Sequence, residues 1–266
     1  MRIDVNAFFG HWPYWPLPHT SGDDVLRLMD RFGIDRAAIT SLRGLHGDWR
    51  QANAETLALA ASHPDRLTPI ATMSPVNGGG GEALRELVGR GFRGVRLYPL
   101  LFQGYGLDGP FAKEICGTAS WLEVPVIVPT RPMMNFRFPT LPIDDVAALA
   151  GRHPDTRFIL SGPNYLSEFQ AAIEAMLRCR NMLIETSCMQ GFQALRRTVD
   201  AVGEGRVLFG TGALLHYPAC NVAKLDHANI SDQQRTAIAS ENALRLLRLP
   251  PPAGKADEPP QRPLIR

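Results

Sequence analysis

The sequence predicts an α/β protein built as a single (β/α)8 barrel, the TIM-barrel fold, on three observations. The chain has 266 residues, close to the ~250 residues typical of this fold. Short apolar runs alternate with amphipathic runs, which favours a parallel sheet covered by helices. Eight such units follow one another, and eight parallel strands close into a barrel. An open, doubly wound sheet is the competing fold, but it normally has a glycine-rich turn after its first strand, and none follows residues 3–9.

The first four units consist of buried strands followed by helices with clear endings. The helix after the first strand has Val25 and Met29 on its apolar face and ends at Gly33. The next helix, residues 51–62, ends before Pro64, because proline cannot continue a helix. The predicted strands of this half are residues 3–9, 37–42, 67–73 and 94–98.

The last four units repeat this alternation. A helix at residues 143–152 ends ahead of Pro154, and the final helix begins after Ser231, a residue typical of an N-cap. The predicted strands are residues 124–128, 157–160, 181–186 and 207–209, and the other helices are residues 111–122, 166–177, 192–202 and 232–247. Residues 1–249 are therefore one domain. Residues 250–266 form a proline-rich tail without hydrophobic periodicity.

The composition gives no sign of a nucleic-acid or membrane partner. The chain has 28 Lys and Arg against 26 Asp and Glu, a formal charge of +2, so no strongly basic surface is expected. No run approaches the ~20 apolar residues of a membrane span, and no signal-peptide core precedes the first strand. The four cysteines, Cys116, Cys179, Cys188 and Cys220, contain no C-x-x-C pair. This pattern predicts reduced thiols in a cytoplasmic protein.

Polar side chains follow the predicted strands at the end of the barrel where active sites lie. Arg96 and Tyr98 are two residues apart and share a strand face. Arginine holds a carboxylate or phosphate through two parallel hydrogen bonds, so converging arginines predict a small anionic ligand. The structural alternative is that Arg96 pairs with Glu185 as a polar core. The candidate ligand-binding residues are Asn6, His11, Arg96, Tyr98, Arg131, Arg137, Asn164, Glu185 and His216.

Several segments resemble one known family in the correct order. They are residues 3–10, 91–99, 124–130, 153–162, 206–212 and 241–243. Together they resemble the amidohydrolase superfamily, in particular the branch that includes aminocarboxymuconate-semialdehyde decarboxylase. The resemblance extends from residue 2 to about residue 249. It implies a barrel of the metal-dependent-hydrolase type with hydrolase or carbon–carbon lyase chemistry.

The resemblance also implies a divalent metal, held by histidines and an aspartate at the strand ends. The matching positions in this chain are Asn6, Phe8, Pro129, Gly162 and Gly212. None is His, Cys, Asp or Glu, and Asn6 alone could ligate, as a weak neutral oxygen donor. The comparison therefore predicts a barrel that lacks the family's metal ligands and needs no cofactor. His11 and His216 could rebuild part of a metal site, but a stable site usually needs three or four ligands.

Three functions remain open from the sequence. The leading one is a metal-free protein that binds a small carboxylate-bearing molecule and retains hydrolase or lyase activity, although no residue can be named as catalytic. The second is a metal-dependent hydrolase or decarboxylase with relocated ligands. The third is an inactive scaffold that binds a partner protein through the aromatic segment at residues 11–15. Those aromatic residues could equally cap the barrel mouth or form a homodimer contact.

Overall fold

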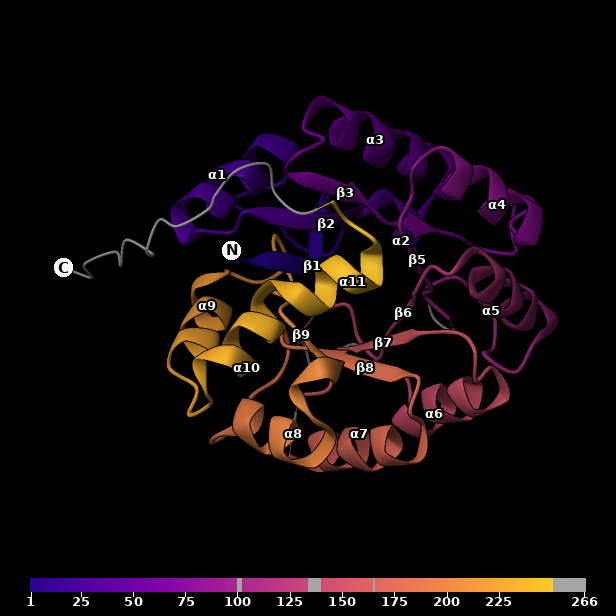
Figure 1. Ribbon diagram of the computed structural model, residues 1–266. Helices are drawn as coiled ribbons and strands as arrows, with labels where there is room; N and C mark the ends of the chain where they lie inside the picture. Colours follow the sequence, from indigo (N-terminus) through magenta and orange to yellow (C-terminus); the bar gives the residue numbers. More distant parts are fainter. Residues whose placement is uncertain (100–101, 134–139, 165, 251–266) are drawn as a thin grey trace.

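Parallel strands form the wall of a barrel in the computed structural model (Figure 1), which describes residues 1–99, 102–133, 140–164 and 166–250. The strands form two hydrogen-bonded runs, β1-β2-β3 and β4 through β9 in sequence order, and the paired strands are parallel. Their bounds are β1 Ile3–Phe9, β2 Arg36–Ser41, β3 Leu67–Pro69, β4 Ala71–Thr72, β5 Val95–Arg96, β6 Val126–Pro129, β7 Phe158–Ser161, β8 Met182–Glu185 and β9 Val207–Leu208. The predicted (β/α)8 barrel is confirmed.

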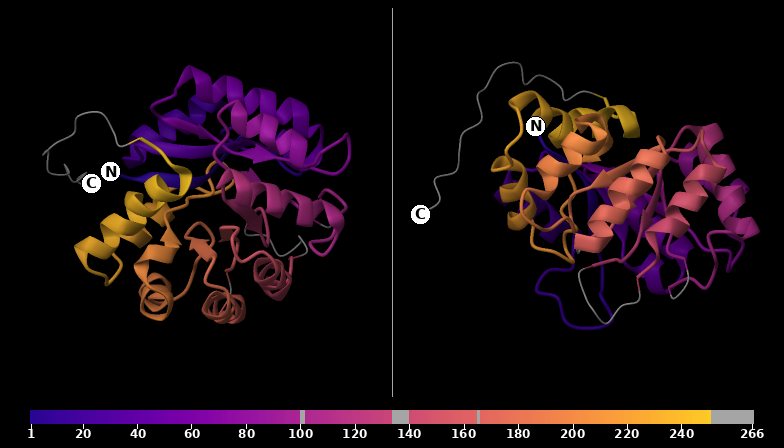
Figure 2. Two further views of the ribbon diagram at one scale, coloured as in Figure 1. Left: turned by 45° about the vertical axis from the view of Figure 1, so that its right-hand side comes forward. Right: turned by 90° about the horizontal axis from the view of Figure 1, so that it is seen from below.

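Helices cover the outside of this wall (Figure 2). They are α1 Gly22–Phe32, α2 Arg43–His46, α3 Trp49–Ser62, α4 Gly81–Gly89, α5 Pro110–Leu122, α6 Ile143–Arg152, α7 Leu166–Arg178, α8 Ala194–Val202, α9 Ala219–Asp226, α10 Asp232–Thr236 and α11 Asn242–Leu247. A 3-10 turn, η1 Glu204–Arg206, precedes β9, and a π-helical segment, η2 Ala237–Glu241, joins α10 to α11. The sequence predicts neither α2 nor α9, both of which lie in loops that follow strands.

The strand predicted at residues 67–73 is divided into two short strands, β3 and β4. β3 pairs with β2, whereas β4 pairs with β5. Pro69, the last residue of β3, has no amide hydrogen and so removes one donor from the ladder. The chain nevertheless follows the predicted path, since the Ile70 amide donates to the Ile39 carbonyl at 2.9 Å.

The seam between β1 and β9 closes the barrel through an irregular stretch of β1. The pairing of β1 with β2 shifts in register between Asp4 and Ala7, which is typical of a β-bulge. The buried Asp4 carboxylate accepts hydrogen bonds from the Asn6 amide at 2.9 Å, from the Thr211 amide at 2.9 Å and from the Thr211 hydroxyl. Asp4 therefore fixes both the bulge and the segment that follows β9.

The bulge changes which β1 side chains point into the barrel. Ile3 and Val5 belong to an apolar cluster with the barrel residues Ile127 and Ile159. Further along the same strand, Asn6 contacts side chains of β7 and β8. A regular strand alternates its side chains between two faces, so Val5 and Asn6 could not both face the interior without the bulge.

The barrel interior is apolar at its N-terminal end and is closed there by the last helix. Ala243 and Leu247 of α11 pack against the interior cluster that contains Leu183 and Leu208. In the right-hand view of Figure 2, the indigo loop that follows β1 extends at the opposite end of the barrel from α11. Because apolar side chains fill the N-terminal end of the barrel interior, polar side chains can gather only at the C-terminal ends of the strands.

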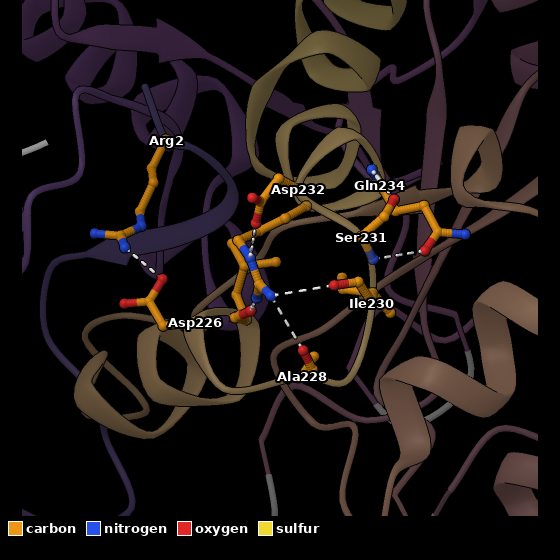
Figure 3. A network of polar contacts seen from close by, with 9 residues as sticks. Arg2, Asp226, Ala228, Ile230, Ser231, Asp232 and Gln234 are labelled. Carbon is orange, nitrogen blue, oxygen red and sulfur yellow. Dashed lines mark hydrogen bonds and ion pairs between the residues drawn. The ribbon is translucent and has the colours of Figure 1, made fainter. Parts of the chain in front are cut away.

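An arginine network holds α9 against its neighbours (Figure 3). The Arg235 guanidinium donates to the carbonyls of Ala228 at 3.1 Å and Ile230 at 3.4 Å, and also to the Leu225 carbonyl. At the same end of α9, Arg2 donates to Asp226 at 2.5 Å. Because these bonds connect the C-terminal end of α9 to Arg2, just before β1, and to α10, the tertiary fold fixes the position of that short helix.

The described helices include none with the length and apolarity needed to cross a bilayer. The four cysteines carry free thiols. Burial raises the pKa of the Cys116 and Cys188 thiols to about 12, so both remain protonated and serve as packing residues. Of the predicted tail, residues 251–266 lie outside the described ranges.

Replacement of Asp4 by asparagine tests the role of this buried carboxyl group in the fold. Burial raises the pKa of Asp4 to about 7, against about 3.9 in an unfolded chain. Its contribution to stability is complete below about pH 3.9 and is lost as the pH rises through about 7. We expect Asp4→Asn to gain stability relative to the parent between about pH 5 and about pH 8, because the amide can retain the Thr211 contacts without ionising. Urea unfolding at both pH values measures this difference, and identical pH profiles would contradict the prediction.

Candidate functional site

A polar cluster occupies the C-terminal half of the barrel interior. Its members come from different strands and are buried: Asn6 of β1, Arg96 of β5, Ser161 of β7, Glu185 of β8 and Ser187 just after it. The sequence predicts three of them, Asn6, Arg96 and Glu185, as site residues. Neighbouring strands of a closed barrel present their inward side chains to a common axis, and this geometry brings the three together.

Asn6 connects the cation of this cluster to its anion. The Arg96 Nη1 donates to Asn6 Oδ1 at 2.6 Å, and Asn6 Nδ2 donates to Glu185 Oε1 at 3.2 Å and to Ser187 Oγ at 3.0 Å. The ion pair considered between Arg96 and Glu185 is therefore an indirect link through an amide. A buried charge is costly unless it is paired or hydrogen-bonded, and Asn6 supplies one such bond to each partner.

Hydroxyl and amide donors surround the Glu185 carboxylate. Ser161 Oγ donates to Oε1 at 2.5 Å, Ser187 Oγ donates to the same oxygen at 2.6 Å, and the Ser187 amide donates to Oε2 at 2.6 Å. These bonds replace the hydration that the carboxylate loses on burial. Ser187 lies two residues after Glu185 and so shares its strand face, a placement that the sequence predicts, whereas no local pattern marks Ser161.

The Arg96 guanidinium is less completely satisfied. It is fully buried, and its central carbon lies 4.6 Å from the centre of the Phe8 ring, a cation–π arrangement. Among the described residues, neither Nε nor Nη2 has a hydrogen-bond partner. An unpaired buried donor costs about 1–3 kcal/mol, and more when it is charged. The site therefore holds two charged donors that an anionic ligand could satisfy.

An aromatic and aliphatic cap lies over the polar cluster. It consists of Phe8, Trp12, Leu42, Leu45, Tyr98, Met133 and Leu215. The Trp12 ring is buried and lies 5.0 Å from Tyr14 and 5.4 Å from His46 in edge-to-face contacts. Trp12 thus belongs to a cap over the barrel mouth, which is one of the alternatives considered for residues 11–15. His11 is exposed and lies outside the buried cluster.

Tyr98 joins the cap as a neutral phenol next to the arginine. Burial raises the pKa of Tyr98 to about 12, although the charge of Arg96 and a side-chain hydrogen bond with it oppose that rise. The tyrosine therefore stays protonated at neutral pH and can donate a hydrogen bond. The predicted placement of Arg96 and Tyr98 at the same end of the barrel agrees with these contacts.

The second predicted arginine has an internal partner. Arg131, after β6, is buried and forms an ion pair with Glu168 of α7. Glu168 also accepts a hydrogen bond from the Asn164 amide at 2.9 Å. Arg131 was expected to receive the ligand, and its ion pair with Glu168 shows that part of its charge is already paired within the protein. Arg137 lies outside the described residues.

Asn164 is buried beside a cavity of about 430 Å³. Within the described part of the chain, its side-chain oxygen and nitrogen both lack a hydrogen-bond partner. The cavity is also lined by Phe169, Gln190, Gly191, Phe192, Ala194 and Arg197. The side-chain amide of Asn164 is therefore available to a ligand in this cavity, and its binding role stays a prediction.

A larger cavity of about 620 Å³ reaches Ser187 from the region between α8 and α9. Lys224 of α9 lines it, and its Nζ donates to the Thr186 carbonyl at 2.6 Å and to Asn221 Oδ1 at 2.8 Å. Burial lowers the pKa of Lys224 to about 8. Lys224 lies in the helix that the sequence analysis did not predict, which explains why it was missed.

His216 lies next to Gly212, one of the positions at which the family resemblance implies a metal ligand. A Cβ at Gly212 would lie 2.6 Å from His216 Nδ1, and Gly212 has φ +71°. Burial lowers the pKa of His216 to about 4, so the ring is neutral at pH 7. A side chain at position 212 would collide with this imidazole and would adopt a strained backbone.

The described residues include no group of three or more His, Cys, Asp or Glu side chains placed to hold a metal ion. Asn6 is the one ligand-capable residue at the compared positions, and its Oδ1 already accepts a hydrogen bond from the Arg96 cation. A positive charge at that distance opposes the binding of a divalent cation. Among the compared positions, the described residues thus offer one neutral donor, and it is already bound to the Arg96 cation.

Known structures share the fold of this chain. A 2,6-dihydroxybenzoate decarboxylase complexed with 2,6-dihydroxybenzoate has a TM-score of 0.72 and 18% identity, over 93% of this chain and 99% of that chain. The 5-carboxyvanillate decarboxylase of Sphingomonas paucimobilis has a TM-score of 0.72 and 15% identity, over 93% and 98%. A dihydroxybenzoic acid decarboxylase from a Polaromonas species, with bound manganese and 2-nitroresorcinol, has a TM-score of 0.70 and 18% identity, over 93% and 97%.

The match to a family model is more informative than these distant structural likenesses. No curated protein matches the chain. The family model described as Amidohydrolase matches residues 4–249, which covers nearly all of the stretch, residue 2 to about residue 249, over which the sequence segments resemble that superfamily. The chain therefore belongs to the amidohydrolase family.

Proposed function

We propose that this amidohydrolase family member binds a small carboxylate-bearing molecule at Arg96, in the centre of the barrel and without a metal ion. The supporting observation is that Arg96 Nε and Nη2 are buried without a partner among the described residues, while Nη1 is held by Asn6. Nε and Nη2 form one edge of the planar guanidinium. That edge matches the two oxygens of a carboxylate.

The surroundings of Arg96 favour an aromatic acid. Phe8 stacks on the guanidinium, and Tyr98, Trp12 and Met133 belong to the same cap. The ring of an aromatic acid, bound through its carboxylate, would pack against these apolar side chains. Its apolar contacts would take the place of those that the side chains now make with one another. The protonated Tyr98 hydroxyl would be a donor to a second polar group on the ring. This ligand class agrees with the 2,6-dihydroxybenzoate present in one structure of similar fold.

Two features support a metal-independent site. The cation of Arg96 lies within hydrogen-bonding distance of Asn6, and the Gly212 position is filled by the neighbouring His216 ring. In this proposal Arg96 supplies the positive charge that receives the carboxylate. The corresponding enzymatic function is a hydrolase or carbon–carbon lyase reaction on that ligand, and we assign no catalytic residue to it.

Replacement of Arg96 by lysine tests the carboxylate site. Lysine keeps the positive charge but loses the planar edge with two donors. We expect benzoate and 2,6-dihydroxybenzoate to bind the parent and to bind Arg96→Lys roughly 10- to 100-fold more weakly, since a hydrogen bond to a charged group is worth about 1.5–3 kcal/mol. Isothermal titration calorimetry measures both affinities.

The matched control is Arg93→Lys, which changes an exposed arginine three residues earlier in the same segment. This variant should bind both acids as the parent does, and circular dichroism should show that each variant is folded. Equal affinity of the parent and Arg96→Lys for both acids would overturn the proposal.

Metal removal separates the proposal from a metal-dependent function with relocated ligands. The protein is purified without chelators, analysed for metal by mass spectrometry, and then treated with EDTA. We expect substoichiometric metal and unchanged affinity for 2,6-dihydroxybenzoate after treatment, because the described residues provide no cluster of metal ligands. Near-stoichiometric zinc or manganese whose removal abolishes binding would contradict this expectation and favour the metal-dependent alternative.

A further inference from the structure

A separate cavity lies at the N-terminal end of the barrel, below β6, β7 and β8. Its volume is about 570 Å³, within the range of small-molecule sites. Val124, Pro125 and Leu183 provide an apolar part of its lining, and Leu183 also belongs to the apolar cluster that fills the barrel interior. The last helix, α11, crosses this end of the barrel (Figure 1) and contributes the remaining side. The cavity is therefore formed by the closed base of the barrel, away from the Arg96 cluster.

The lining of this cavity is strongly basic. Five arginines face two carboxylates, Glu123 and Asp155, which leaves an excess of three positive charges. The arginines are Arg157, Arg180, Arg206, Arg245 and Arg248. Arg157, Arg180 and Arg206 directly precede β7, β8 and β9, Arg245 belongs to α11, and Arg248 follows that helix. Residues remote in sequence thus place like charges around one space, which costs free energy unless an anion offsets it.

The partners of these arginines show which charges are available. Arg248 forms an ion pair with Glu123, and Arg206 donates to the Met176 carbonyl at 2.7 Å. Arg157 and Arg180 are exposed and form no ion pair with any acidic group of the described residues. Burial and the charge of Arg180 both lower the pKa of Arg206, which indicates that these two cations repel each other.

We infer that this basal cavity is a binding site for a small molecule with two adjacent phosphate groups. Two adjacent phosphate groups carry several negative charges at neutral pH, which offset the excess of three positive charges in the lining. The guanidinium edges of Arg157 and Arg180 hold phosphate oxygens in pairs, and the apolar floor receives the organic part of the ligand. This inference is independent of the carboxylate site, because it shares no residue with the Arg96 cluster.

Calorimetric titration with pyrophosphate and with ATP, at low ionic strength and without magnesium, tests the inference on the full-length protein. We expect saturable binding of about one equivalent of either probe to the parent. The double variant Arg157→Gln/Arg180→Gln should bind at least about tenfold more weakly, since each hydrogen bond to a charged group contributes about 1.5–3 kcal/mol. Tighter binding of ATP than of pyrophosphate would show that the site prefers a nucleoside polyphosphate to the inorganic anion.

The matched control is Arg31→Gln/Arg85→Gln, which removes two exposed arginines from α1 and α4, away from the cavity lining. This variant loses the same formal charge and should keep the parent affinity. Equal weakening in both double variants would show a general effect of net charge and overturn the site. The absence of saturable binding, or equally tight binding of succinate, would overturn it as well.

Discussion

The hydrogen bond from Arg96 to Asn6 places a positive charge at the centre of the barrel, and the arrangement of the neighbouring side chains follows from it. A guanidinium removed from water requires hydrogen bonds and an opposite charge. Asn6 supplies the first hydrogen bond and connects the cation to Glu185, whose carboxylate is held by Ser161 and Ser187. Phe8 covers one face of the guanidinium. The two donors that remain without partners among these residues define the side from which an anion would complete the site.

This cluster depends on the irregularity in β1. Without the bulge, the period of two along a strand would place Asn6 on the face opposite Val5, against the helices. Asp4 stabilises the bulge by accepting hydrogen bonds from Asn6 and Thr211. The same carboxylate connects β1 to the segment after β9, so the closure of the barrel and the position of Asn6 share one cause.

The segment that follows β9 packs closely against the polar cluster. Gly210 and Gly212 leave room for large neighbours: a Cβ at Gly210 would lie 2.1 Å from Glu185 Oε2, and one at Gly212 would lie 2.6 Å from the His216 ring. These distances are too short for any side chain to be added without rearrangement. The glycines that follow β9 are thus sterically coupled to Glu185 and His216.

The sequence by itself determined the eightfold alternation of strands and helices, the family, and the presence of Asn6, Arg96 and Glu185 in one barrel. These features follow from local hydrophobic periodicity and from the rule that the strand ends of a barrel meet at one mouth. The tertiary structure alone decided which arginine is paired: Arg131 contacts Glu168 from a different helix, whereas Arg96 keeps two donors without partners among the described residues. It also decided the placement of Ser187, Lys224 and the basal arginines, because their contacts join residues far apart in the sequence and no local pattern records such distances.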